Sequence, residues 1–315
     1  MVSYVYILQR LVFGVATFLL ATSAAYIILN IIPGDIAHRM LGDFATPDRL
    51  AELRATLGVD RPLPQRYAEW VWNLLQGDLG QSAYSGKNVT SEIISRVPVT
   101  LELSILAAVV SIVLGLPAGI ISALKPGSWI DAIVRPVSII GLAVPSFWIG
   151  LLVLLTPSTL WNYAPPAYVP FFDSPLKNLQ LMIPSAAILG LAFMASISRV
   201  SRTTMLEVLR EDYVRTARAK GLRETTVTLR HALRNALIPV LTLISLQFAA
   251  LLGGTVIIEN IFSLPGLGTT AIRAINVRDY QLVQGFVVFM VLVYVGVNLL
   301  VDLMASFLDP RIRFG

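Results

Sequence analysis

Six apolar runs of about 20 residues each dominate this sequence and limit what it can fold into. A helix of about 20 apolar residues spans a hydrocarbon core of about 30 Å. Hydrophobic residues make up 56% of the chain and charged residues 14%, which is more apolar surface than a soluble core of 315 residues could bury. We therefore predict an all-α integral membrane protein with six transmembrane helices. The runs are residues 11–32, 99–124, 132–155, 179–198, 237–258 and 282–307.

The distribution of basic residues predicts the orientation in the membrane. Residues 201–235, here called the basic segment, hold eight Arg or Lys against four Asp or Glu. Short loops with such an excess face the cytoplasm. With six crossings, Lys125, Arg135, Arg311 and Arg313 fall on the same side. We expect a multi-pass membrane protein with both termini in the cytoplasm and residues 33–98 outside.

Within the basic segment, residues 212–221 (DYVRTARAKG) carry the marks of a short helix. Asp212 favours a helix start, Lys220 lies in the last turn, and Gly221 is a typical residue just past a helix end. A structured basic helix between two spans suggests a docking element, on which Tyr213, Val214 and Ala217 would offer apolar contact to a partner. The alternative is a helix that contacts only solvent or anionic lipid headgroups.

The outer segment, 33–98, is predicted to fold into a small helical cap. Thr46–Pro47–Asp48 is a helix start and Gly58 its end, and a second helix runs from Pro64 to Gly77. The second helix has an apolar face that must be covered. Either local packing or an external partner could cover it. That face consists of Tyr67, Trp70, Val71 and Leu74.

The sequence contains no recognisable catalytic or cofactor site. Cysteine is absent, and the predicted topology places His38 and His231 on opposite sides of the membrane. Gly80, Gly86 and Lys87 have the wrong spacing for a phosphate loop, and Asn88 stands where Ser or Thr should be. We expect no cofactor or metal in this chain, no nucleic-acid partner despite the net charge of +5, and no enzymatic activity.

Ionisable residues in the spans are few and lie near the predicted span ends. A self-sufficient carrier would more often hold such groups at mid-bilayer. We therefore expect the energy for any transport to come from another protein. The residues concerned are Glu102, Arg199, Glu259 and Asp302, of which Asp302 is expected to find a polar or cationic partner.

Pro and Gly residues interrupt several spans. Such interruptions occur where neighbouring helices or a cavity satisfy the freed backbone groups. They are consistent with close helix packing or with the lining of a translocation path. The stretch 145–148 combines a kink with a hydroxyl and aromatic rings, and its path candidates are Pro145, Ser146 and Trp148.

Several motifs resemble the inner-membrane permease subunits of binding-protein-dependent ABC importers. The match is to the B-type subunit of the dipeptide/oligopeptide/nickel branch and runs nearly end to end. In the family's cytoplasmic signature, Glu-Ala-Ala followed after three residues by Gly, this chain has Arg215–Thr216–Ala217 and Gly221. The other matching stretches are Pro33–Gly34–Asp35, residues 53–63, residues 77–82, residues 97–103, residues 144–148, residues 212–239, Phe262–Gly268 and residues 308–313.

The resemblance implies the type I importer permease architecture and a set of partners. These are a homologous second permease subunit in a heterodimer, two ATP-binding subunits and an extracytoplasmic substrate-binding protein, in a bacterial or archaeal cytoplasmic (inner) membrane. It also implies that the short basic helix is a coupling helix, which fits a groove on the ATPase. The coupling residues would be Asp212, Tyr213, Arg215, Thr216, Ala217, Arg218 and Gly221.

The expected function is therefore that of a membrane-spanning subunit for ATP-driven uptake of short peptides. Nickel chelates, glutathione or another small solute are alternative substrates of this branch, and a self-sufficient secondary transporter is an alternative mechanism. The expected division is residues 1–32 for the first span, 33–98 for the outer segment, and 99–315 for a five-helix core that includes 201–235.

Overall fold

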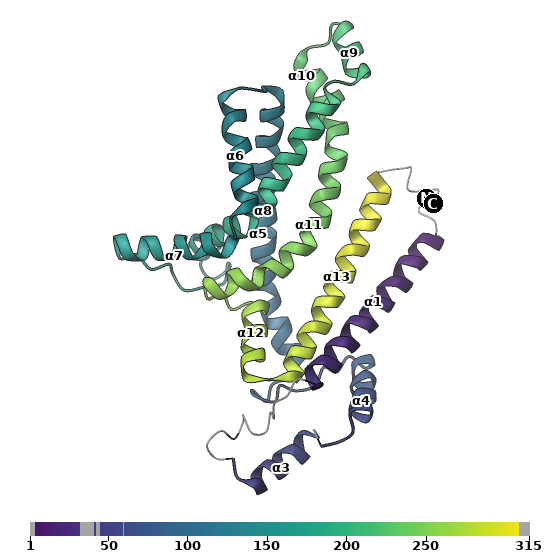
Figure 1. Ribbon diagram of the computed structural model, residues 1–315, viewed down its shortest axis with the longest axis vertical. Helices are drawn as coiled ribbons and strands as arrows, with labels where there is room; N and C mark the ends of the chain where they lie inside the picture. Colours follow the sequence, from purple (N-terminus) through teal and green to yellow (C-terminus); the bar gives the residue numbers. More distant parts are fainter. Residues whose placement is uncertain (1–3, 32–40, 42–44, 59, 309–315) are drawn as a thin grey trace. The chain divides into compact units, whose positions relative to one another are not determined.

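The computed structural model describes residues 4–31, 41, 45–58 and 60–308. These residues are helical or irregular, apart from one isolated antiparallel bridge between Gln81 and Asn88, which confirms the all-α prediction (Figure 1). The motif at 33–35, His38 and residues 309–313 lie outside the described residues. The helices are α1 (Tyr4–Ile31), α3 (Pro47–Leu57), α4 (Leu63–Leu75), α5 (Val89–Leu124), α6 (Trp129–Ala143), α7 (Ser146–Trp161), α8 (Pro175–Val208), α9 (Asp212–Ala219), α10 (Glu224–Thr226), the π-helical turn η2 (Val227–Ala232), α11 (Leu233–Ile261), α12 (Leu267–Val277) and α13 (Tyr280–Leu308).

Four of the predicted spans are confirmed as helices that are long and apolar enough to cross a membrane. They are Gln9–Ile31, Val89–Leu124, Pro175–Val208 and Tyr280–Leu299. The fifth predicted span lies in α11. Two helical stretches, Glu224–Phe248 and Ala250–Ile261, meet within α11 at an angle of 50°. Counting each bent pair of helices as one span, the described residues hold up to six.

The third predicted span, 132–155, is divided between two helices. Helices α6 and α7 meet there at an angle of 99°. Pro145 lacks a backbone N–H and its ring disfavours a helical conformation in the preceding residue. Val144 accordingly has extended backbone angles, φ −86° and ψ 125°. A single proline at this position thus divides one apolar run into two helices.

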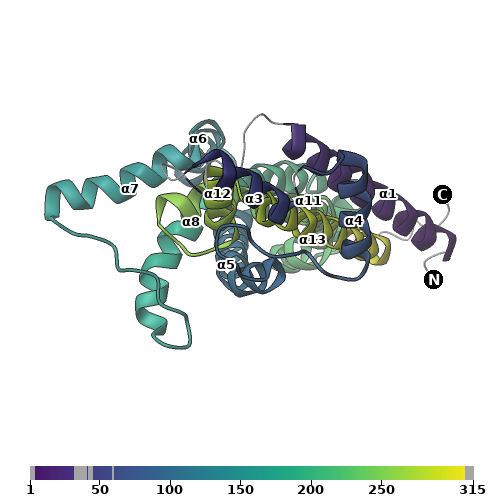
Figure 2. The same ribbon diagram turned by 90° about the horizontal axis from the view of Figure 1, so that it is seen from below.

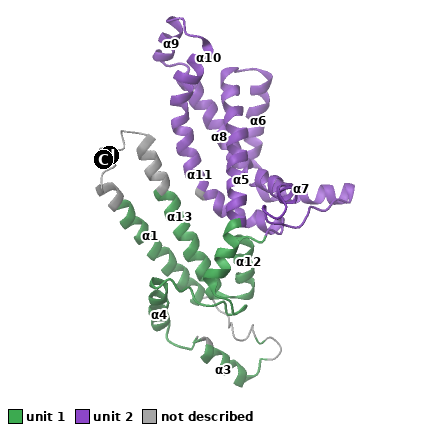
Figure 3. Cartoon of the chain, turned by 180° about the vertical axis from the view of Figure 1, so that it is seen from behind, with its two compact units in different colours: residues 1–98, 265–300, 313–315 green, residues 99–264, 301–312 purple. Residues whose placement is uncertain are grey.

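The chain forms two compact units (Figure 3). The first comprises residues 1–98, 265–300 and 313–315, and the second comprises 99–264 and 301–312. Residues 265–300 thus group with the N-terminal part of the chain. Helix α5 starts in the first unit and continues in the second.

In the first unit, the two helices predicted in the outer segment are present. Helix α3 has Thr46 as its N-cap and ends at Gly58, whose φ of +66° suits glycine. The face of α4 packs on α1, where the Tyr26 ring lies 5.4 Å from the Tyr67 ring and 4.9 Å from the Trp70 ring, between centroids. At this part of the apolar face, local packing is therefore the reading that the structure supports.

The loop that superficially suggested a phosphate site has a structural role in the first unit. Ser82 Oγ donates a hydrogen bond to Asp279, which is only 2% exposed. Asp279 Oδ1 also accepts a hydrogen bond of 3.2 Å from the backbone N–H of Leu282 and so caps the first turn of α13. The loop before α5 is thereby fixed to the start of α13.

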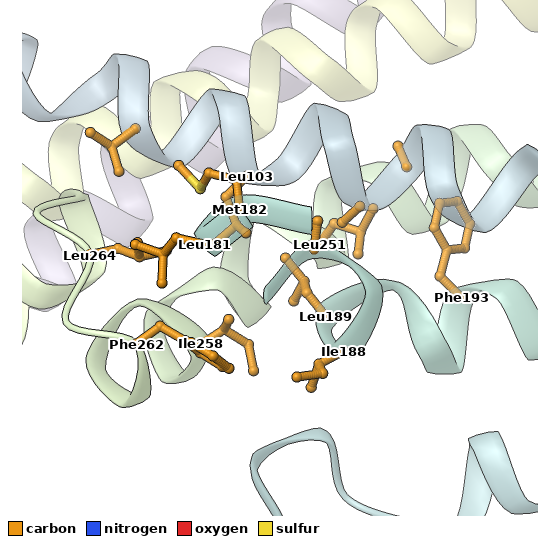
Figure 4. Packing of buried hydrophobic residues seen from close by; sticks show 14 of the residues in the cluster. Leu103, Leu181, Met182, Ile188, Leu189, Phe193, Leu251, Ile258, Phe262 and Leu264 are labelled. Atoms are coloured by element: carbon orange, nitrogen blue, oxygen red, sulfur yellow. The ribbon is translucent and has the colours of Figure 1, made fainter. Parts of the chain in front are cut away.

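The second unit is built around α8. Its core holds side chains from α5, α8 and α11 together with the turn that follows α11 (Figure 4). Leu103, Leu181, Met182, Ile258 and Leu264 are at most 2% exposed in this core. This packing gives α8 partners on several sides along its length.

Glycines bring α5 and α8 into backbone contact. A Cβ added at Gly115 would lie 2.6 Å from the Met194 carbonyl oxygen, and one added at Gly119 would overlap the Ser198 carbonyl oxygen. The two glycines are four residues apart on α5, a spacing that allows close helix packing in membranes. Helices α5 and α8 are thus held together along two turns.

Candidate functional site

Within the basic segment, α9 is a short helix with defined ends, as predicted for residues 212–221. Glu211 is the N-cap residue of α9, and Asp212 lies in the first turn. At the other end, the Leu222 N–H donates to the Ala217 carbonyl at 3.4 Å and the Gly221 N–H to the Arg218 carbonyl at 2.9 Å. This pair of bonds is a Schellman motif, and the φ of +78° at Gly221 is the left-handed conformation that the motif requires.

Helix α9 lies on a small apolar core of its own. Val214 is fully buried and Ala217 is 6% exposed, and both pack on Val227 of η2. The partly buried Val208 and Leu209, at the end of α8, complete this core. In Figure 1, α9 and α10 lie beyond the ends of α8 and α11, at one end of the second unit.

This burial corrects one expectation. Val214 and Ala217 were expected to offer apolar contact to a partner, but their side chains face the chain's own core. With eight residues in about two turns, α9 can bury only one face, and the apolar residues at positions 214 and 217 take it. They position the helix instead of presenting a surface.

Two further predicted residues, Tyr213 and Arg218, make contacts within the segment. Arg218 pairs with Glu224 of α10 at 2.7 Å between Nη2 and Oε1. This hydrogen bond raises the pKa of the Arg218 guanidinium above its ordinary value. Tyr213 Oη accepts a hydrogen bond of 2.8 Å from Asn235 Nδ2, which links α9 to α11. Both pairs are exposed, so each contributes at most about 1 kcal/mol.

The exposed side chains of α9 include Asp212, Arg215 and Thr216. Arg215 and Asp212 lie 3.4 Å apart, with side chains 71% and 93% exposed. An ion pair so open to water is weak, and the guanidinium keeps donors free for other acceptors. The exposed side of α9 can therefore bind carboxylate and carbonyl groups of another molecule.

An ionic cluster around a buried carboxylate, which the sequence prediction missed, includes Arg202 at the start of the basic segment. The Asp131 side chain of α6 is 1% exposed and pairs with Arg202 of α8 at 2.8 Å between Nε and Oδ1. Ser122 Oγ donates to Asp131 Oδ1 at 2.5 Å, the Gly127 N–H donates to Oδ2 at 2.9 Å, and Arg135 Nη2 lies 3.0 Å from Oδ2. We call these five residues the Asp131 cluster.

The path candidates occupy a separate place in the second unit. Pro145 is the N-cap residue of α7, Ser146 is its first residue, and Trp148 is 52% exposed. In Figures 1 and 2, α7 extends away from the other helices of this unit and from α9. The structure therefore does not bring the path candidates and the α9 residues together, and the path assignment remains a prediction.

The cavity of about 230 Å³ found in the first unit includes none of the path candidates. Aromatic, amide and charged side chains line it, among them Tyr26, Trp70, Asn30, Arg61 and Gln284. Among the described residues, no three His, Asp or Glu side chains are grouped so that they could hold a metal ion.

Comparison with known proteins places the chain in a family. The family described as binding-protein-dependent transport system inner membrane component matches residues 115–314, and the corresponding N-terminal family matches residues 3–104. The chain belongs to this family of inner-membrane transport components. It is therefore a transport component with the permease architecture, as the motifs indicated.

Similar proteins match over nearly the whole length of the chain. The dipeptide transport system permease protein DppB of Escherichia coli K12 is 39% identical over 333 residues, covering 98% of both chains. The di/tripeptide transport system permease protein DppB of Pseudomonas aeruginosa is 41% identical over 331 residues, with the same coverage. A crystal structure of an amino acid ABC transporter with histidines matches with a TM-score of 0.54 at 15% identity, over 69% of this chain and 94% of the other, which supports the fold alone.

Proposed function

We propose that this chain is a translocation subunit of an ATP-driven importer of short peptides. The observation that carries the proposal is a helix, α9, that is fixed on its own apolar core and turns a charged face outward. Relatives named as dipeptide and di/tripeptide permeases match it over 98% of their length, which supports peptides as the substrate class.

In this proposal the basic segment is cytoplasmic and is the attachment point of an ATPase subunit. Arg215, Asp212 and Thr216 contact the ATPase directly, because their side chains are exposed on α9. Tyr213, Ala217, Arg218 and Gly221 hold the helix in shape. When the ATPase closes on ATP, it displaces α9 as a rigid helix, and α8 and α11 carry this movement into the membrane.

Membership of the family supports a proposal for the remaining partners. A homologous second permease subunit would complete the translocation path, two ATP-binding subunits would supply energy, and an extracytoplasmic binding protein would deliver substrate. Both termini would then lie in the cytoplasm and α3 and α4 outside. Pro145, Ser146 and Trp148, at the bend between α6 and α7, are proposed to face the path or the second subunit.

A cross-linking experiment tests the attachment. The chain has no cysteine, so a single Thr216→Cys variant carries one defined thiol. A short thiol-reactive cross-linker is expected to join it to the ATPase subunit in the assembled complex, with a yield that changes when ATP binds. The matched control, Thr203→Cys, is also exposed but lies on α8, outside α9. Equal yields from both positions would refute the assignment of α9.

The substrate class needs a separate experiment. Labelled dipeptide uptake into vesicles that hold the full assembly is measured against unlabelled competitors. Dipeptides and tripeptides are expected to compete, whereas nickel chelates, glutathione and free amino acids are not. Competition by one of the latter group instead would replace peptides by that class and leave the role of the chain intact.

A further inference from the structure

We infer that Asp131 is a positioning residue that joins α6 and the α5–α6 turn to α8, so that a push on α9 moves these helices as one body. This inference rests on the proposed function, because it concerns how a movement that starts at α9 enters the membrane. It assigns a role in transport to the five residues of the Asp131 cluster, none of which is in α9 or among the path candidates.

The Asp131 cluster forms a rigid connection, here called the joint, between several parts of the chain. Its carboxylate receives hydrogen bonds from the end of α5 through Ser122, from the turn through Gly127, and from α8 through Arg202. Arg202 donates from two nitrogens, at 2.8 Å to Oδ1 and 3.2 Å to Oδ2. Three chain elements therefore meet at one buried carboxylate, and the two-point contact with Arg202 fixes direction as well as distance.

Arg202 of the Asp131 cluster lies close, along α8, to the residues that pack under α9. Val208, which packs under α9, is six residues from Arg202 on the same helix, or about 9 Å at 1.5 Å per residue. In the turn between them, Thr204 Oγ1 donates to the Ala236 carbonyl of α11 at 3.1 Å. A displacement of α9 thus reaches Arg202 through less than two turns of continuous helix.

The chemistry of the cluster favours positioning over stabilisation. A buried ion pair contributes little to stability compared with apolar side chains of similar volume, because both charges lose their hydration. What the pair supplies is a directional contact that an apolar cluster lacks. The backbone contacts of Gly115 and Gly119 hold α5 against α8 independently of the Asp131 cluster, so the cluster adds a directional contact for α6 and the turn.

The test uses the complete importer in lipid vesicles and separates coupling from folding. Asp131→Asn keeps the shape of the side chain but removes its charge, and Ser122→Ala removes a single donor. Arg199→Gln is the control, since Arg199 is an exposed cation one turn earlier on α8. Three quantities are measured for each variant: peptide taken up per ATP hydrolysed, ATP hydrolysis stimulated by the loaded binding protein, and the melting temperature of the complex.

Asp131→Asn is expected to lower uptake per ATP by about tenfold, in the range of coupling between distant sites, while stimulated ATP hydrolysis stays within about twofold. Ser122→Ala should give a smaller loss of the same kind, and Arg199→Gln none. If Asp131→Asn lowers only the melting temperature, with uptake per ATP unchanged, the cluster is merely structural and the inference fails. If wild-type protein shows no ATP-dependent uptake at all, the proposed function fails instead.

A covalent substitute for the joint gives a second, independent readout. A Cβ at Gly141 of α6 would lie 3.1 Å from the Ala195 Cβ of α8, close to the separation of about 3.5–4.5 Å in a disulfide. Oxidised Gly141→Cys/Ala195→Cys in the Asp131→Asn background should recover uptake per ATP, and reduction should remove the recovery. A disulfide that forms and raises the melting temperature without recovering uptake per ATP would overturn the inference.

Discussion

The contact between α5 and α8 gives a prediction whose size can be worked out from the structure. In Gly119→Ala, the added Cβ would overlap the Ser198 carbonyl oxygen and lie 2.8 Å from the Ser201 Cβ. Since carbon atoms pack at about 3.5–4.0 Å, the two helices would have to separate by roughly 1 Å at this point. Neither obstacle is the end of a flexible side chain, so no rotamer change relieves the overlap.

Two opposing terms set the expected free energy change. Overpacking of this kind costs about 1–3 kcal/mol, and the backbone obstacle puts Gly119→Ala at the upper end of that range. Replacing glycine by alanine inside a helix returns about 1 kcal/mol. The net expectation is a free energy of unfolding lower by about 2 kcal/mol, which lowers the melting temperature by a few degrees.

The assay is thermal unfolding of the purified chain in detergent micelles, followed by far-ultraviolet circular dichroism. Gly253→Ala is the matched control, because nothing lies within 4 Å of a Cβ added at Gly253 in α11. The control should melt at or slightly above the wild-type temperature. If Gly119→Ala melts as high as Gly253→Ala, close packing of α5 on α8 through these glycines is refuted.

Three further substitutions test other parts of the structure. Val214→Asp places a charge in the core under α9 and should therefore speed hydrogen exchange at the backbone amides of α9. Thr216→Asp on the outer face should leave that exchange unchanged, and equal exchange in the two variants would contradict the assigned faces. Gly221→Ala strains the left-handed position and should weaken protection of α9 by about 1 kcal/mol, so unchanged exchange would argue against the Schellman end. Trp70→Ala removes a ring that packs against Tyr26 and should destabilise the packing of α4 on α1 by about 2 kcal/mol. Limited proteolysis at 58–75 should then be faster than in the wild type. The control is Trp72→Ala, because Trp72 is exposed, and equal proteolysis rates in the two variants would contradict this packing.

Sequence reasoning succeeded where one local rule decides the structure. Gly58 and Gly221 follow helix ends with positive φ, as expected of glycine just past a C-cap. The apolar runs correctly gave the four unbroken spans, because length and hydropathy alone determine whether a helix can cross a bilayer. These features depend on a few neighbouring residues or on composition.

These local rules did not predict the break at Pro145. The run 132–155 is continuous in hydropathy, so it predicted one span, although Pro145 and the extended Val144 divide it. A proline in an apolar run produces either a kink or a break, and the packing of the neighbouring helices decides between the two. That packing cannot be derived from the run itself.

The faces of α9 and the Asp131 cluster depend on contacts with residues outside the helix concerned. Residues 212–221 were predicted as a helix, but which face of that helix is buried depends on Val227 and Leu209, which lie outside α9. Asp131 and Arg202 are 71 residues apart. One local sign was available, since Ser128 and Asp131 have capping-box spacing and Asp131 therefore had a place at a helix start.

The central claim is tested most directly by measuring which energy source, ATP or an ion gradient, drives peptide uptake. Vesicles that contain the chain with a second permease subunit, ATPases and binding protein are loaded with ATP or, separately, given only a proton or sodium gradient. The account predicts labelled dipeptide uptake that requires ATP, is blocked by vanadate, and is lost in Arg215→Glu, which reverses a charge on the outer face of α9. Uptake driven by the ion gradient in vesicles that contain this chain alone would contradict it.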